Sequence, residues 1–271
     1  HDFAVWIKAP ENHLMKWDSP WGPSYPGWHI ECSVMSQKYL GEVFDIHTGG
    51  IDLIPTHHEN EIAQSKGMCG KIPANYWMHG EFLLINGGKM SKSLGNVYLL
   101  QDIVDRGYDP LVYKLFCYSI QYRKKLNFTW EGMDSAKIAL DRLREAYQKH
   151  LTGTEDVAEE LISKYEKDFN EAINDDLNMP VAMSVVWEVA KRTEKSKKVA
   201  ELLKKFDRVL GIKIDEHKEE EIPDDIKELL TKRVEARKNK DWAESDKIRD
   251  IIKEKGYIVK DSKEGQTVEK C

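Results

Sequence analysis

Three side chains that bind transition metals well stand in two short segments near the start of the chain. Cys32 belongs to GWHIECS, and His57 and Glu61 belong to HHENEIAQS. The second segment reads as a helix, so His57 and Glu61, four residues apart, share one face. A thiolate, an imidazole and a carboxylate together suit Zn²⁺. The residues alone leave Cys32 open between a metal ligand and a small buried apolar residue.

Two other chemistries for Cys32 find little support. The chain has four cysteines, widely spaced and without a framework pattern, and we expect no export signal. A reducing cytoplasm is therefore expected, and disulfides are not. A zinc-protease motif would need a second histidine at the position that Ile62 occupies. No adjacent base points to Cys32 as a nucleophile.

A second reactive segment is Lys89-Met90-Ser91-Lys92-Ser93, which follows paired glycines. Lysines on a hinged loop can swing onto a polyphosphate and neutralise the charge that develops during phosphate displacement. An ordinary solvated turn is the alternative interpretation.

Short β-like runs alternate with helical segments up to about residue 100, which predicts a parallel α/β sheet in residues 1–100. VFDIHTGG is expected to end a strand at its paired glycines, and YWMHGEFLLING to form a strand pair or a strand followed by a turn. The segment PTHHENEIAQSKG predicts a helix with Thr56 as a possible N-cap and Gly67 as its stop.

After residue 101 the apolar residues recur at three- and four-residue steps, which predicts a helical bundle over residues 101–215. In one helix the expected apolar stripe is Ala136, Ile138, Ala139, Leu143 and Ala146. The acidic segment DEHKEEEIPDD predicts a linker. It opens a last unit, residues 216–271, of two helices broken at Asp241-Trp242 and a small hairpin at GYIVKDSKEGQTVE.

Composition limits the class of protein. The chain has 271 residues, 32% of them charged, and a formal net charge of −6. The mean hydropathy is −0.60, and no apolar run approaches the roughly 18–20 residues of a membrane span. We expect a soluble protein without a membrane partner or signal peptide. The chain does not begin with Met, and we expect it to be part of something longer.

The order of the segments carries more information than any one of them. GWHIECS, FDIHTGGIDL, HHENEIAQS, YWMHG, KMSKSLGN, NFTWEG, DDLNMP and ARKNKDWAESDKIRD together closely resemble cysteinyl-tRNA synthetase, a class I aminoacyl-tRNA synthetase. The resemblance covers essentially the whole chain and corresponds to the C-terminal part of the family. It implies the second half of a Rossmann-type catalytic domain, a DALR-like helical bundle with a stem-contact region, and a small α/β anticodon-binding domain.

The resemblance implies a reaction and its cofactors. L-cysteine and ATP, with Mg²⁺, would form cysteinyl-adenylate, and the cysteinyl group would pass to tRNA(Cys). The family holds one Zn²⁺ per subunit by two cysteines, a histidine and a glutamate, which map here to Cys32, His57 and Glu61, with the other cysteine upstream of this chain. Zinc binds a thiolate well and a serine hydroxyl poorly, so it would select the substrate. We expect a cytoplasmic monomer.

The same resemblance assigns roles to other residues of the catalytic domain. Gly49, Gly50 and Asp52 would contact ATP, and Lys92, with Lys89 second, would contact its phosphates. Trp28 would pack against the bound amino acid, or alternatively anchor its loop.

In the terminal unit the resemblance places anticodon contacts at Arg237, Trp242, Asp246 and Asp261. Arginine and aspartate can hydrogen-bond the edges of unstacked bases, and tryptophan can stack on one. A local basic patch is expected at Lys232, Arg233, Lys238 and Lys240.

Two departures from the family pattern shape these expectations. The chain contains no HIGH-type motif, so we expect it not to form cysteinyl-adenylate by itself. The order DLIPTHH shifts the proline and leaves His58 as an alternative ligand, although the spacing to Glu61 favours His57. A mycothiol-pathway cysteine ligase shares the catalytic domain but needs no anticodon reader, and a noncatalytic tRNA-binding fragment or paralogue needs neither KMSKS nor zinc ligands.

Overall fold

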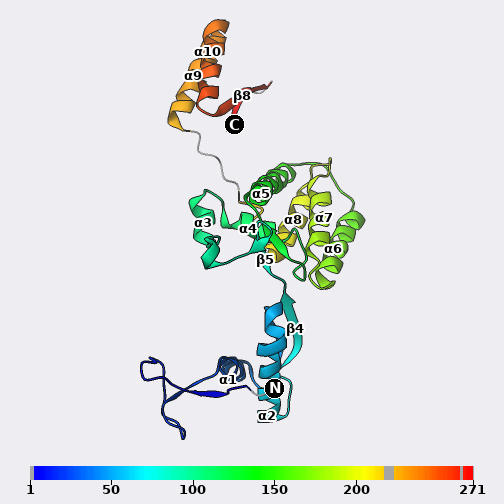
Figure 1. The fold of residues 1–271 in the computed structure, drawn as a ribbon. Coiled ribbons are helices and arrows are strands. Elements are labelled where there is room, and N and C mark those ends of the chain that lie inside the picture. Colours follow the sequence, from blue (N-terminus) through cyan, green and yellow to red (C-terminus); the bar gives the residue numbers. More distant parts are fainter. Residues whose placement is uncertain (1–2, 217–222, 263–264, 271) are drawn as a thin grey trace. The chain divides into compact units, whose positions relative to one another are not determined.

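A computed structural model describes residues 3–216, 223–262 and 265–270. The chain forms two compact units, His1–Glu216 and His217–Cys271, each with its own internal contacts. Figure 1 traces both units along the sequence. Residues 217–222 of the predicted acidic linker lie outside the described residues.

The beginning of the first unit mixes strands with helices, as predicted from the sequence. Its elements are β1 (Trp6–Lys8), β2 (Ser24–Pro26), α1 (Trp28–Leu40), β3 (Phe44–Gly50), α2 (Glu59–Cys69) and β4 (Ala74–Gly80). Strand β1 pairs with β2 in the antiparallel sense, whereas β3 and β4 are parallel. Parallel neighbours need a crossover connection, which here contains α2, and Figure 1 shows α2 lying beside β4.

Helix α2 begins and ends differently from the sequence prediction. Thr56 does not cap the helix. A 3₁₀ turn over Ile51–Leu53 and a π turn over Ile54–His58 lead directly into its first residue, Glu59. Gly67 lies inside the helix. The helix ends at Cys69, where Gly70 adopts φ +74°, the left-handed conformation that glycine adopts without a steric penalty.

A second small sheet carries the KMSKS segment. It has the order β6-β5-β7 and consists of β5 (Leu83–Ile85), β6 (Gly88–Lys89) and β7 (Leu126–Phe128). Asn86 and Gly87 both have positive φ, so they form the tight turn that joins β5 to β6. Because β7 pairs in parallel with β5, this sheet combines residues on both sides of residue 100.

Helices dominate the rest of the first unit, in agreement with the apolar periodicity. They are α3 (Leu100–Asp105), α4 (Pro110–Cys117), α5 (Trp130–Leu151), α6 (Glu159–Asn174), α7 (Met179–Ala190) and α8 (Lys197–Leu210). The rings of Phe169 and Phe206 stack at 4.1 Å inside the bundle of α5–α8. No helix among the described residues is long and apolar enough to cross a membrane.

The apolar stripe of α5 differs from the one expected. Ile138 is 52% exposed. It is only two residues from Ala136, a spacing that puts it on the other side of a helix. The face that packs into the bundle consists of Met133, Ala136, Leu140, Leu143, Arg144, Tyr147 and His150.

The terminal unit contains two helices and a hairpin, as predicted. Helix α9 (Asp224–Lys238) and helix α10 (Trp242–Glu254) pack together, and strands β8 (Tyr257–Ser262) and β9 (Gly265–Lys270) pair in the antiparallel sense. Asp241 caps α10 by accepting a hydrogen bond from the backbone N–H of Glu244 at 3.1 Å.

Candidate functional site

The three predicted metal ligands meet between α1 and α2. Cys32 is half-buried on α1, whereas His57 and Glu61 are buried, and the ligand atoms of all three lie within 4.8 Å of one another. His57 Nε2 lies 2.8 Å from Glu61 Oε1. That pair does not have hydrogen-bond geometry, and Glu61 Oε1 has no hydrogen-bond partner among the described residues.

This arrangement fits a bound cation. A buried carboxylate oxygen without a hydrogen bond carries a desolvation penalty, which the adjacent His57 would offset only in its protonated form, and burial lowers the pKa of His57. A cation contacted by both Oε1 of Glu61 and Nε2 of His57 would offset that penalty. Sulfur, nitrogen and oxygen donors together match the preference of zinc.

A neighbouring histidine can set the tautomer of His57. The Nδ1 atoms of His57 and His29 are 2.8 Å apart. If His57 carries its proton on Nδ1, it donates to His29 and leaves Nε2 free to bind a metal. Hydrogen bonds of this kind commonly orient metal-binding imidazoles.

A second histidine group surrounds the other oxygen of Glu61. His47 Nε2 lies 2.8 Å from Glu61 Oε2, and His47, His58 and Glu61 form another set of potential ligands within 4.8 Å. His58 Nδ1 contacts His79 Nε2 at 2.8 Å, and His58 Nε2 is buried without a hydrogen-bond partner in the described part of the chain.

The sequence interpretation missed His29, His47 and His79. One signal was available: FDIHTGG and YWMHG each place a histidine near the end of a predicted strand. In the structure β3 and β4 are parallel, and Gly49 pairs with His79. The two histidines therefore come to the same end of the strand pair.

Burial favours the neutral form of three of these imidazoles, those of His57, His58 and His79. It lowers the pKa of His57, although Glu61 opposes the shift, and it lowers the pKa of His79. For His58, burial and the nearby imidazoles lower the pKa to about 4. Burial also raises the pKa of the Cys32 thiol, with a further contribution from Glu61. Metal binding at Cys32 must therefore release a proton.

Trp28 lies at the open side of the cluster. It is the first residue of α1 and 61% exposed, and its ring centroid lies 4.5 Å from that of His57. An exposed indole face beside the potential metal ligands is available for contact with a small molecule.

The predicted ATP residues lie at the end of β3, where Gly49 and Gly50 are its last two residues, and just after it, where Asp52 stands. A Cβ atom at Gly49 would lie only 2.6 Å from the imidazole of His58, and one at Gly50 only 2.4 Å from Oδ1 of Asp52. Gly49 is therefore needed for packing against the buried His58, whereas the close neighbour of Gly50 is the exposed side chain of Asp52, in the 3₁₀ turn that follows. Their contact with ATP stays a prediction.

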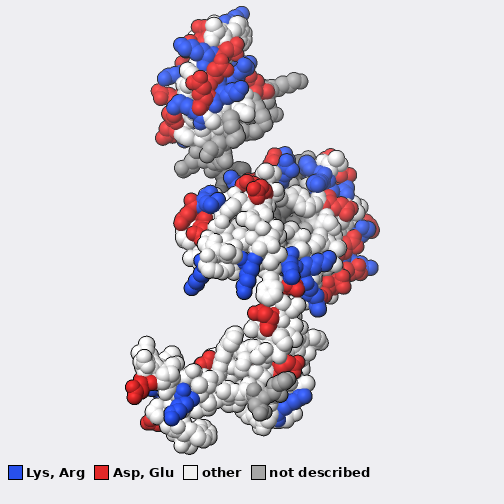
Figure 2. Space-filling view, in the orientation of Figure 1, with Lys and Arg blue, Asp and Glu red and all other residues white. Residues whose placement is uncertain are grey.

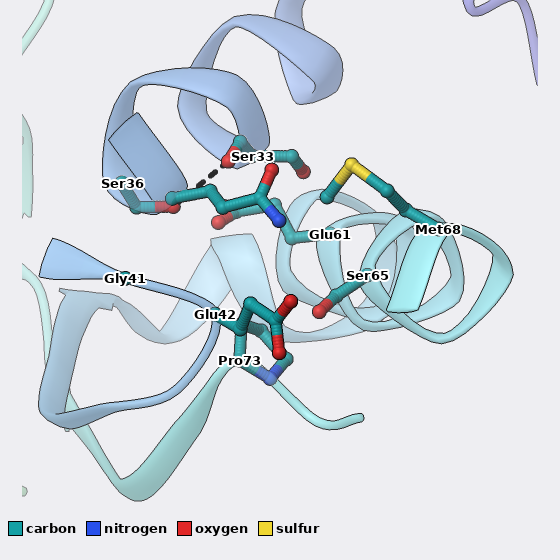
Figure 3. Close-up of a pocket in the computed structure, with 9 residues that line it drawn as sticks. Ser33, Ser36, Gly41, Glu42, Glu61, Ser65, Met68 and Pro73 are labelled. Carbon is teal, nitrogen blue, oxygen red and sulfur yellow. Dashed lines mark hydrogen bonds between the residues drawn. The ribbon is translucent and has the colours of Figure 1, made fainter. Parts of the chain in front are cut away.

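A small cavity lies between α1 and α2 on one side of Glu61. Figure 3 shows Ser33 and Ser36 of α1, and Glu61, Ser65 and Met68 of α2, around it. Its volume of about 10 Å³ is room for roughly one water molecule, so it cannot admit an amino acid.

The KMSKS segment holds its two lysines outward. Lys89 ends β6 and Lys92 begins a 3₁₀ turn, both are exposed, and neither ammonium has an ion-pair partner among the described residues. Asn96 fixes the loop, because its side chain bonds both Ser91 N at 2.8 Å and Lys89 O at 2.9 Å. Met90 packs inward against the core, beside an apolar cavity of about 140 Å³.

In the terminal unit three of the four predicted anticodon residues meet. Arg237 Nη1 donates to Asp261 Oδ2 at 2.8 Å, and its guanidinium carbon lies 5.9 Å from the ring centroid of Trp242. Trp242 is 58% exposed. Asp246 stands one turn further along α10, exposed and 3.8 Å from Arg249, and has no described contact with the other three.

The predicted basic patch is wrong in one member. Arg233 is only 1% exposed, so it cannot offer its charge to a phosphate at the surface. It pairs instead with Asp261, a residue 28 positions away. Figure 2 shows acidic and basic side chains interleaved over α9 and α10 on the face drawn, without a patch of one sign.

Three family profiles match successive parts of the chain. A profile described as "tRNA synthetases class I (C) catalytic domain" covers residues 1–138, a DALR domain covers residues 168–215, and a "Cysteinyl-tRNA ligase anticodon binding domain" covers residues 219–268.

Similar proteins agree with these profiles. A cysteine--tRNA ligase 1 of Burkholderia lata is 44% identical over 98% of this chain and 56% of its own length. A cysteine--tRNA ligase of Bacillus cereus is 44% identical over 97% of this chain and 60% of its own length. The chain thus spans somewhat more than half of these relatives.

A solved structure shares the fold at low sequence identity. The Agrobacterium radiobacter K84 agnB2 LeuRS-tRNA-LeuAMS ternary complex superposes with a TM-score of 0.55 at 15% identity, over 73% of this chain and 32% of the other. That likeness concerns the fold alone. The profile over residues 1–138, which matches half of the sequence, and the ligase relatives establish that the chain belongs to the cysteinyl-tRNA synthetase family.

Proposed function

We propose that this chain supplies the zinc site, the KMSKS loop and the anticodon reader of an enzyme that attaches L-cysteine to tRNA(Cys). The carboxylate of cysteine would attack the α-phosphate of ATP with release of pyrophosphate. A ribose hydroxyl at the end of the tRNA would then take the cysteinyl group from the adenylate as AMP leaves. The observation that carries the proposal is the meeting of Cys32, His57 and Glu61 within 4.8 Å.

The substrate would be chosen at this cluster. Zinc bound there would accept the thiolate of cysteine as a ligand and would bind the hydroxyl of serine poorly. Losing a coordination bond separates two substrates far better than a small difference in size can. Trp28 would cover the bound amino acid with its exposed ring, and His29 would hold His57 in the metal-binding tautomer.

The phosphates of ATP, with Mg²⁺, would be met by the KMSKS lysines. The ammonium groups of Lys92 and Lys89 make no ion pair with any described residue, and Asn96 holds the backbone of their loop in place. Such groups stabilise the charge that develops on the departing pyrophosphate and form no covalent bond with it. Gly49, Gly50 and Asp52 would line the nucleotide site beside them.

Recognition of tRNA would involve the terminal unit. The exposed indole of Trp242 offers a stacking surface, and Arg237 and Asp261 offer donors and acceptors for base edges. Asp246 would add a further acceptor. The anticodon-binding profile over residues 219–268 favours a tRNA substrate over the amino-sugar of the mycothiol-pathway ligase. The presence of the metal-ligand cluster argues against a protein that only binds tRNA.

Cobalt(II) tests the substrate choice without measuring turnover. It replaces zinc in tetrahedral sites, and each thiolate that binds it adds a charge-transfer absorption. Titrating L-cysteine into the cobalt-loaded chain should increase this absorption, whereas L-serine should leave it unchanged. A Cys69→Ser variant, which lacks a thiol outside the cluster, should respond like the parent. An equal response to both amino acids would refute thiol selection.

The role of the KMSKS loop is tested by pyrophosphate exchange. The assay needs a form of the protein that includes the first half of the catalytic domain. Lys92→Ala should lower the cysteine-dependent rate by on the order of 100-fold or more, because one charge-stabilising group is lost. Lys89→Ala should cost less, and Lys66→Ala, on an exposed face of α2, should cost nothing. Equal rates for Lys92→Ala and the parent would exclude the assigned role.

A further inference from the structure

Arg233 lies at the centre of the terminal unit, between α9 and the hairpin. Its Nη1 and Nη2 atoms donate to Oδ1 and Oδ2 of Asp261, each at 2.9 Å. Nη1 also donates to Gln266 Oε1 at 2.7 Å, and Gln266 Nε2 donates to the carbonyl of Leu230 at 2.7 Å. The buried guanidinium is therefore held from two strands through its Nη atoms, Gln266 is tied back to α9, and Arg233 Nε has no hydrogen-bond partner among the described residues.

Asp261 joins this buried fork to the surface. Its side chain is 42% exposed, and Oδ2 accepts a second hydrogen bond from Arg237, which is itself 39% exposed. Arg237 makes one bond to the carboxylate, whereas Arg233 makes two. Paired, parallel bonds of the second kind are both stronger and more specific in direction.

The two arginines therefore differ in whether they can leave the carboxylate of Asp261 without depriving it of its main partner. If Arg237 turned away from Asp261 toward an RNA base, Arg233 would still balance the carboxylate and hold its plane. If Arg233 were absent, Asp261 would depend on Arg237 alone, and a base could recruit Arg237 only by leaving the carboxylate without a partner.

We propose that Arg233 is a positioning residue for RNA recognition, which holds Asp261 in place so that Arg237 can exchange its contact with Asp261 for one with an unstacked base. This inference rests on the proposed reading of the anticodon by the terminal unit. It assigns Arg233 as the arginine that stays on Asp261 and Arg237 as the one that exchanges its contact. The exposed ring of Trp242, 5.9 Å from Arg237, would stack on the same base.

The test compares two RNA probes on the full chain. One is a synthetic stem-loop with the sequence of the tRNA(Cys) anticodon arm, and the other is the same stem-loop with its anticodon bases replaced by uridine. Arg233→Met should reduce the ratio of the two affinities by on the order of 10-fold. The affinity for the substituted loop and its salt dependence should stay nearly unchanged, because these report phosphate contacts that a buried residue does not make.

Lys232→Met is the matched control. It removes the same charge from the neighbouring position of α9, but the Lys232 side chain is 58% exposed. It should weaken binding of both stem-loops by the same factor and leave their ratio unchanged. An unchanged ratio in Arg233→Met, in a chain whose α9 amides remain protected from exchange, would overturn the positioning role.

Two further measurements keep the inference testable if Arg233→Met does not fold. Gln266→Met leaves both charges in place and should still reduce the ratio several-fold. In Arg233→Lys, the carbon NMR signal of the Asp261 carboxyl should titrate at a higher pH than in the parent, because the fork is lost. No change in either would refute the proposal. A parent chain that binds both stem-loops equally would instead refute the proposed anticodon reading itself.

Discussion

The molecule contains two side-chain clusters, one around the carboxylate of Glu61 and one around that of Asp261. They differ in how completely the carboxylate oxygens are hydrogen-bonded. Glu61 is surrounded by a thiol and imidazoles, and its Oε1 atom and the nearby His58 Nε2 are buried without hydrogen bonds among the described residues. Asp261 stands between two guanidinium groups, and both of its oxygens accept hydrogen bonds. The first cluster pairs its carboxylate with no lysine or arginine among the described residues, whereas the second pairs its carboxylate with two guanidinium groups.

This difference indicates what each cluster would bind. Buried polar atoms are nearly always paired in native proteins, so unpaired ones point to a missing partner, here a cation. The Asp261 cluster has both carboxylate oxygens paired, and its buried unpaired atom among the described residues, Arg233 Nε, is a donor that a cation cannot satisfy. The cluster can bind a ligand only by exchanging one of its present contacts, and the exposed Arg237 is the contact that can be exchanged.

The largest expected effect is the loss of zinc from the Glu61 cluster when a ligand is removed. Cys32→Ser should lower zinc affinity by more than about 100-fold, since even neighbours of ligands cost 10- to 100-fold. Competition with a chromogenic chelator measures this, and Cys69→Ser is the matched control. If Cys32→Ser kept its zinc and His58→Ala lost it, the metal would belong to the His47, His58 and Glu61 group instead.

Zinc should stabilise one cluster and leave the other unchanged. At a free concentration 100 times its dissociation constant, zinc stabilises the folded site by about 2.7 kcal/mol, equivalent to roughly 100-fold slower opening. Hydrogen exchange should therefore slow in α1 and α2 when zinc is added. The amides of α9 and α10 should not respond, and slowing there would contradict the contrast between the clusters.

A smaller effect is expected from the histidine that supports Glu61. His47→Ala removes the contact of its Nε2 with Glu61 Oε2, and should lower zinc affinity by about 10- to 100-fold. His13→Ala is the comparison, because His13 stacks on Tyr25 and contacts the carbonyl of Met15. Equal zinc affinity in the two variants would mean that His47 does not orient the ligand.

The sequence predicted the elements better than their faces. Helical periodicity located the bundle and the two terminal helices, because apolar spacing follows directly from helix geometry. It misplaced Ile138, which is apolar but exposed, and Arg233, which is charged but buried. A charged residue on a predicted helix normally indicates solvent, and its burial became visible only with Asp261, which β8 brings from 28 residues away.

The candidate metal site, too, could be predicted from the sequence only in part. His57 and Glu61 share a local helical spacing, so their proximity could be predicted without a fold. His29, His47 and His79 come from three different elements, and the parallel register of β3 with β4 is what brings the last two to one end. Tertiary pairing of this kind leaves no periodic trace in a single sequence.

The smallest expected effect is the pH dependence of the terminal unit. The hydrogen bonds of Arg233, with those of Arg237, lower the pKa of Asp261 to about 2. The unfolded value is near 3.9, so the ionised carboxylate stabilises the fold above about pH 4, and this contribution is lost as the pH falls toward 2. Asp261→Asn should therefore differ most from the parent above pH 4 and least near pH 2.

Because Asp261 is partly exposed, the difference in unfolding free energy should not exceed about 1 kcal/mol. Urea unfolding followed by hydrogen exchange of the α9 amides measures it in both chains across that pH range. Asp246→Asn is the matched control, since Asp246 is exposed and its contact with Arg249 is long, at 3.8 Å. A parent and an Asp261→Asn variant that differ equally at pH 2 and pH 6 would show that the stabilisation comes from packing. The ion pairs of Asp261 would then not stabilise the terminal unit, and the contrast with Glu61, whose Oε1 lacks a hydrogen bond among the described residues, would not hold.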